Sequence, residues 1–128
     1  MIKSTLSKGK VLVSHTLVIS MLASFASVCF AAYVPGGVTE GKASWYNGEG
    51  KVGAAGVKLH SRAAAHRTAP FYIWPTVVRT VNGDPEVDVE ILDRGPFVSG
   101  VEIDLVKSAF QQIGNTTEGY INVQIFWP

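Results

Sequence analysis

Residues Ile91–Leu105 read ILDRGPFVSGVEIDL. Asp93 and Asp104 each stand where an apolar run ends, and Arg94-Gly95-Pro96-Phe97 lies between the two runs. Glycine supplies backbone angles that other residues avoid and proline fixes its own φ, so this linker predicts a rigid turn. Two carboxylates at paired strand ends suit chemistry on a glycosidic bond, and they equally suit holding turns together through backbone N–H groups.

The N-terminal residues have the layout of a secretory signal peptide. Three lysines precede an apolar run from Thr16 to Phe30, and Cys29-Phe30-Ala31 follows the pattern of a small-residue cleavage site. The run is short for a membrane span, and no second apolar run follows it. We therefore expect residues 1–31 to be removed, which leaves a secreted or periplasmic chain without a membrane anchor.

Composition limits what the remaining chain can be. Cys29 is the only cysteine and would leave with the leader, so we expect neither disulfides nor thiolate zinc ligands. The histidines show no metal-ligand spacing, so we expect no metal and no other cofactor. Loss of the three leader lysines leaves eight Lys and Arg against ten Asp and Glu. A net-negative chain without a basic run argues against nucleic-acid binding. The length of the remaining chain suits one domain. We expect this domain to be a monomer.

Short apolar runs alternate with turns along this domain. Residues 32–38 (AYVPGGV) read as a flexible lead-in, and the domain is expected over residues 39–128. Thr39–Tyr46 and Tyr120–Trp127 read as the first and last strands. Glu86–Asp93 alternates apolar and acidic residues, which predicts a half-buried strand.

Other segments are less regular. Residues 57–61 (VKLHS) are a short strand candidate, residues 63–68 (AAAHRT) are ambiguous, and Phe71–Asn82 suggests one or two strands broken at a proline. Leu105–Ile113 has helical spacing, with Asp104 as a plausible N-cap. About six short strands and one short helix, separated by Gly and Pro turns, predict a mainly β fold and a small closed barrel.

Several motifs then occur in a fixed order: GKASWY (41–46), AAAHRTAPF (63–71), DRGPFVSG (93–100) and IDL (103–105). Together they resemble the rare lipoprotein A (RlpA-like) family of double-psi β-barrels, over Gly41 to about Gln124. The resemblance implies a six-stranded double-psi β-barrel with one short helix. It also implies a periplasmic lytic transglycosylase that cuts the glycan strands of peptidoglycan.

The resemblance carries over to individual residues. Asp93 matches the aspartate of the family's DRGP motif, His66 the histidine of its AAH motif and Asp104 the aspartate of its DLS motif, so these are the expected catalytic residues. Two positions depart from the family. Val57 follows GAAG where the family has a glutamate that is thought to be the general acid, and Val106 replaces a serine that supports the helix start.

The loop GAAG (53–56) also resembles the GACG loop of barwin-like and expansin-like barrels, which include proteins that bind polysaccharide without cutting it. The chain is similar as well to small secreted bacterial barrels that inhibit papain-like cysteine proteases. The implied partner is therefore cell-wall glycan or a secreted cysteine protease. The first reading is an RlpA-like barrel that acts on or binds peptidoglycan, weakened as an enzyme by Val57. The second is a non-catalytic protease inhibitor acting through loops such as 48–56 and 69–75.

The carboxylates allow more than one division of roles. Glycoside cleavage needs a proton donor whose pKa is raised by an apolar setting, and a carboxylate that stabilises developing positive charge. Pro96-Phe97 gives Asp93 an apolar neighbourhood, whereas Arg94 favours its charged form. Asp93 could thus be the stabilising carboxylate, with Asp104 or Glu49 as the donor. The alternatives are that Asp93 ties its turn and that Asp104 caps the helix.

Further candidates surround these acids. His66 could orient Asp93 or shuttle a proton, or be a buried structural histidine. Arg94 could clamp a substrate acid or bridge to a barrel carboxylate. Aromatic rings beside the loops could stack on sugars or anchor a protein partner, and the substrate-binding candidates are Trp45, Tyr46, Tyr72 and Trp74.

Overall fold

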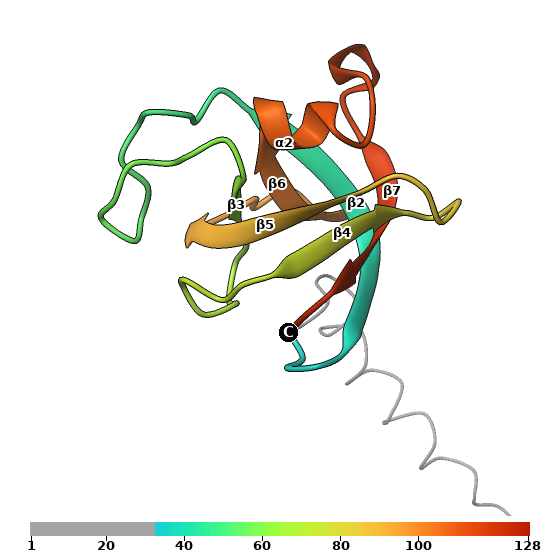
Figure 1. Ribbon diagram of the computed structural model, residues 1–128, viewed down its shortest axis with the longest axis horizontal. Coiled ribbons are helices and arrows are strands. Elements are labelled where there is room, and N and C mark those ends of the chain that lie inside the picture. Colours follow the sequence, from blue (N-terminus) through green and yellow to red (C-terminus); the bar gives the residue numbers. More distant parts are fainter. Residues whose placement is uncertain (1–32) are drawn as a thin grey trace, which may run out of the picture. The chain divides into compact units, whose positions relative to one another are not determined.

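The computed structural model describes residues 33–128, and the expected signal peptide lies outside them (Figure 1). Six strands close into a barrel in the order β2-β6-β3-β5-β4-β7. They are β2 (Val38–Tyr46), β3 (Ala63–Ala65), β4 (Thr76–Thr80), β5 (Glu86–Asp93), β6 (Val101–Val106) and β7 (Ile121–Phe126). A short helix α2 (Lys107–Gln111) and a 3₁₀ helix η2 (Thr116–Glu118) connect β6 to β7. The predicted six-stranded, mainly β double-psi barrel with one short α-helix is confirmed.

Two parallel strand pairs define the topology. β2 runs parallel to β6, and β3 runs parallel to β5, while the other four pairs are antiparallel. Parallel partners cannot be joined by a tight hairpin, so each pair brings together segments that are distant in the sequence. The short strand β3 lies between β5 and β6. The C-terminal parts of β5 and β6 therefore lie on either side of β3.

The core lies inside the barrel and under α2. Alternate residues of the strands point inward, and these are almost completely buried; among them are Val87, Val89, Ile91, Ile103, Leu105, Val123 and Ile125. Phe110 of α2 is fully buried and packs on the same cluster. Burial of a ring of this size contributes about 1.5–3 kcal/mol. Figure 1 shows α2 beside the ends of β2 and β6, where it covers the barrel interior.

Three local predictions are corrected. Residues 57–61 do not form a strand. Lys58 makes only an isolated antiparallel bridge with Val52, where the loop folds back so that residues 57–59 lie beside residues 51–53. The helix begins at Lys107, because Leu105 and its neighbours belong to β6. Asp104 is therefore not the N-cap. That position is Val106, which provides no side-chain capping hydrogen bond.

The two ends of the described chain lie together. The Gly36 N–H donates to the Pro128 carbonyl at 3.0 Å, and the Trp127 N–H donates to the Gly37 carbonyl at 3.0 Å. The rings of Tyr33 and Trp127 meet edge to face, with centroids 5.0 Å apart. Among residues 33–128, no helix is both long enough and apolar enough to cross a membrane.

Candidate active site

Asp93 and Asp104 lie on either side of one small residue. Ala65 of β3 is the register partner of Asp93 on β5 and of Asp104 on β6. Because neighbouring strands are about 4.8 Å apart, the Cα atoms of the two acids are separated by about 10 Å. Ala65 contributes only a methyl group to the space between them. The sequence prediction that these two carboxylates are paired therefore has a structural basis in β3.

Each acid receives a hydroxyl from β2. Residues two apart on a strand share a face, so Ser44 and Tyr46 point to the same side of the sheet. The Ser44 hydroxyl donates to Asp104 Oδ1 at 2.8 Å, and the Tyr46 hydroxyl donates to Asp93 Oδ2 at 2.9 Å. The motif GKASWY thus supplies one hydrogen-bond donor to each carboxylate. Ser44 was missed in the sequence analysis, although its alternation with Tyr46 is visible there.

The loop GAAG forms a cradle for Asp93. The Ala54 and Arg94 backbone N–H groups donate to Asp93 Oδ1 at 2.8 and 3.0 Å. A side chain at Gly53 would put its Cβ 2.6 Å from the Leu92 carbonyl and 3.3 Å from the Asp93 carboxyl carbon, so only glycine allows this approach. Both Asp93 oxygens accept hydrogen bonds, as an ionised carboxylate does.

Asp104 has a different environment. Burial raises the pKa of Asp104 to about 6, the negative charge of Asp93 acts in the same direction, and the hydrogen bond from Ser44 acts against them. Burial, the hydrogen bond to Asp93 and the charges of both aspartates raise the pKa of Tyr46, which therefore keeps its proton and remains a donor. Two nearby carboxyls in unlike environments can divide the roles of proton donor and charged stabiliser between them.

His66 is turned toward other partners. Its fully buried ring accepts the Thr68 and Ala69 N–H groups at Nδ1, at 3.2 and 3.0 Å. The other nitrogen, Nε2, lies 3.3 Å from Glu102 Oε2, so in the neutral ring Nε2 carries the proton and donates it to that carboxylate. His66 meets Asp93 only through its backbone, whose N–H donates to the Asp93 carbonyl at 3.2 Å. Its contribution to the acids is therefore positional.

Arg94 holds loops in place. Its Nη1 donates to the carbonyls of His66 and Ala69 at 3.2 and 2.9 Å, and its guanidinium stacks on Phe71 at 3.8 Å. None of these partners is a barrel carboxylate. The side chain fastens the segment after β3 to the end of β5.

The aromatic candidates separate into two groups. Trp45 lies on the opposite face of β2 from Tyr46, with its Nε1 donating to the Thr116 carbonyl at 3.0 Å. Tyr72 is exposed and its hydroxyl donates to the Ala55 carbonyl at 3.3 Å, next to the cradle of Asp93. Trp74 is about half exposed. The structure therefore brings Tyr46 and Tyr72 to the acids and directs Trp45 elsewhere.

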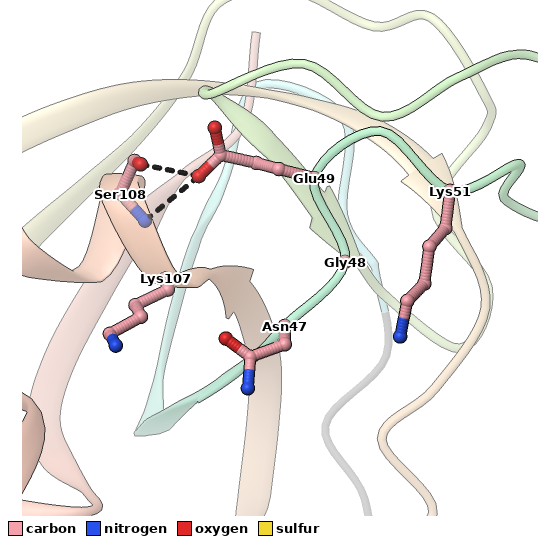
Figure 2. Close-up of a pocket in the computed structure, with 6 residues that line it drawn as sticks. All are labelled: Asn47, Gly48, Glu49, Lys51, Lys107 and Ser108. Atoms are coloured by element: carbon pink, nitrogen blue, oxygen red, sulfur yellow. Dashed lines mark hydrogen bonds between the residues drawn. The ribbon is translucent and has the colours of Figure 1, made fainter.

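A separate hollow of about 250 Å³ opens beside the start of α2 (Figure 2). It is lined by Asn47, Gly48, Glu49, Lys51, Lys107 and Ser108. The Glu49 carboxylate points toward Ser108 and accepts both its backbone N–H and its hydroxyl. Glu49, the alternative proton donor, is therefore engaged with α2. Among residues 33–128, no three His, Cys, Asp or Glu side chains gather as metal ligands.

The sequence is similar to those of several known proteins. Endolytic peptidoglycan transglycosylase RlpA of Vibrio cholerae is 42% identical over 96 residues, covering 71% of this chain and 36% of the relative. Probable endolytic peptidoglycan transglycosylase RlpA of Aquifex aeolicus is 39% identical over 85 residues, covering 63% of this chain and 37% of the relative. The chain thus spans little more than a third of the length of these relatives.

Two solved structures share the fold at low identity. The expansin of Clavibacter michiganensis has a TM-score of 0.56 at 20% identity, covering 70% of this chain and 49% of its own. The Streptomyces papain inhibitor has a TM-score of 0.57 at 19% identity, covering 74% of this chain and 97% of its own. The family model described as lytic transglycolase matches residues 38–125. The chain therefore belongs to the RlpA-like lytic transglycolase family of double-psi β-barrels.

Proposed function

We propose that this protein is exported and cleaves the glycan strands of peptidoglycan, with Asp104 as general acid–base and Asp93 as the stabilising carboxylate. The observation that carries the proposal is the pairing of these acids across Ala65, each with its own hydroxyl donor. The names of the relatives agree with this substrate, but they belong to proteins of which this chain matches about a third. We therefore infer cleavage from the geometry of the site.

The reaction does not consume water, and one group, Asp104, carries out both proton transfers. Protonated Asp104 gives its proton to the glycosidic oxygen, the bond to the anomeric carbon breaks, and the leaving sugar departs as an alcohol. Asp93 faces the positive charge that develops on the anomeric carbon. The Asp104 carboxylate then removes the proton of the sugar's own 6-hydroxyl, whose oxygen bonds to the anomeric carbon. The product is a 1,6-anhydro sugar, and Asp104 is again protonated.

The valine at position 57 is the reason why we assign the general acid–base role to Asp104. It stands where the family resemblance places the glutamate, it is 38% exposed, and its carbonyl accepts the Gly53 N–H at 3.0 Å. The loop that would present a third acid is thus the loop that cradles Asp93. With valine at this position, we assign the proton to Asp104, whose pKa burial raises to about 6.

A digestion experiment tests cleavage. Residues 32–128 are incubated with purified peptidoglycan, both intact and stripped of stem peptides, and mass spectrometry is used to look for 1,6-anhydro products. We expect products from the wild type, none from Asp104→Asn or Asp93→Ala, and undiminished products from Glu49→Gln, which loses a carboxylate outside the site. Failure of the folded wild type to release anhydro products would remove the cleavage step. Co-sedimentation with peptidoglycan would then show whether the barrel binds glycan without cutting it.

A second candidate is inhibition of a papain-like cysteine protease. Exposed apolar side chains on the loops favour it: Tyr72 is 54% exposed and Phe97 is 75% exposed. The likeness to the Streptomyces inhibitor supports the fold alone. An inhibitor needs no catalytic acids, so titration of papain should then give the same inhibition constant for the wild type and Asp93→Ala. Unchanged papain activity at a large molar excess of the protein would exclude this candidate for papain.

A further inference from the structure

Tyr72 holds an unfavourable backbone conformation. Its φ is +69°, and it is the only non-glycine residue between 33 and 128 with a positive φ. Residues with a Cβ avoid this region and glycine occupies it freely, so a bulky aromatic residue is an outlier here. Strained residues of this kind gather at functional sites, where the surrounding structure holds them.

The ring of Tyr72 is fixed and yet open to solvent. Its backbone N–H donates to the Ile91 carbonyl at 2.9 Å, and its hydroxyl donates to the Ala55 carbonyl at 3.3 Å. Phe71 meets the ring edge to face, with centroids 6.4 Å apart. Despite these contacts, 54% of the residue is exposed. A ring held at both ends and exposed between them is preorganised to bind a flat partner.

The position of the ring links it to the candidate active site. The Ala55 N–H donates to the Leu92 carbonyl at 3.1 Å, and the neighbouring Ala54 N–H donates to Asp93. Tyr72 therefore contacts the same loop, residues 53–56, that donates a hydrogen bond to Asp93. The C–H face of a pyranose ring is apolar and suits an aromatic ring, while sugar hydroxyls suit the polar groups beside it.

We propose that Tyr72 forms a sugar-stacking subsite that positions the glycan strand beside Asp93. The inference rests on the proposed function, because it takes peptidoglycan glycan as the ligand. A glycine at this position would relieve the backbone and remove the ring. Tyr72→Gly is therefore expected to weaken glycan binding without lowering the stability of the fold.

The test compares variants of the protein in an Asp104→Asn background, which keeps the ligand intact. The probe is soluble glycan strands of alternating N-acetylglucosamine and N-acetylmuramic acid, freed of stem peptides. Affinity is measured by calorimetry and the melting temperature by fluorescence for Tyr72→Gly and Tyr72→Phe. Val81→Ala is the matched control, because it trims a side chain that is 52% exposed at the opposite end of β4.

For Tyr72→Gly we expect a dissociation constant at least about tenfold higher and a melting temperature no lower than that of the background. Tyr72→Phe should regain most of the lost affinity, and Val81→Ala should change neither quantity. Equal glycan affinity of Tyr72→Gly and the background would overturn the subsite. So would a loss of papain inhibition in Tyr72→Gly with unchanged glycan affinity, which would assign the ring to a protein partner. If no variant binds the strands and the active wild type releases no anhydro products, the proposed function itself fails.

Discussion

Asp104→Asn is expected to stabilise the fold at neutral pH while abolishing glycan cleavage. Burial, and then the charge of Asp93, raise the pKa of Asp104 from 3.8 to about 6. A raised pKa means that the native state binds this proton more tightly than the unfolded chain does. Stability therefore falls as the pH rises from about 4 through about 6, and the full cost of the ionised carboxyl is present above pH 6. Asparagine keeps the shape of the side chain and an oxygen that can accept the Ser44 hydroxyl, and it carries no charge.

The size of the effect follows from the two pKa values. At about 1.4 kcal/mol per unit, the difference between 3.8 and about 6 gives an upper bound of about 3 kcal/mol. Asp104 is only partly buried, and solvent screening reduces this to about 1–2 kcal/mol. For a domain of this size, that is a rise in melting temperature of at least about 4 °C. The gain should be complete above pH 6 and should shrink toward zero near pH 4, where the carboxyl is largely protonated in the native state and increasingly so in the unfolded chain.

Urea unfolding followed by tryptophan fluorescence, from pH 4 to pH 8, measures this difference. Asp84→Asn is the matched control, because it makes the same chemical change on an exposed turn between β4 and β5. It should alter the free energy of unfolding by less than about 0.5 kcal/mol at every pH. The reasoning would be refuted by an Asp104→Asn variant that is less stable at pH 8, or equally stabilised at pH 4 and pH 8.

Three further substitutions test other parts of the barrel. Gly53→Ala pushes its Cβ against the Leu92 carbonyl, 2.6 Å away, so we expect a loss of about 1–3 kcal/mol in urea unfolding and weaker digestion of peptidoglycan. Glu102→Gln removes the buried ion pair with Arg67, at 3.0 Å, and should cost about 3 kcal/mol by the same assay. Val57→Glu returns a carboxyl to the loop beside the site. The rate of anhydro-product release should rise at least about tenfold with stability almost unchanged, and an unchanged rate would show that the loop presents this position away from the substrate.

The long strands could be predicted from sequence and the short one could not. β5 was visible because Val87, Val89 and Ile91 alternate with acidic residues, and one register satisfies that pattern. β3 consists of three alanines, Ala63–Ala65, which show no alternation and have a weak preference for strands. Its position is decided by pairing with β5 and β6, which lie far along the chain. Local sequence carries no record of that pairing.

The same limit applies to the site. The motifs indicated Asp93 and Asp104 as a pair, and the structure places them on either side of Ala65. The helical spacing after Asp104 suggested an N-cap, but Leu105 faces the barrel interior and extends the strand instead. His66 lies in a motif that indicates catalysis, and its ring is bound to Glu102, a residue 36 positions away. Side-chain direction depended on contacts that only the folded barrel creates.

Two residues near Asp93, Asp104 and Tyr72, have features that are unfavourable for the stability of the barrel. Asp104 keeps a partly buried carboxyl whose charge is unfavourable beside another acid, and Tyr72 keeps a backbone angle suited to glycine. Each has a substitution that should leave the fold at least as stable, so stability does not explain either residue. A barrel that served only as a scaffold would gain from Asp104→Asn and Tyr72→Gly without any loss. If both variants gain or keep stability, and the first loses cleavage while the second loses glycan affinity, then the valine at position 57 marks a rearranged glycan site and not an abandoned one.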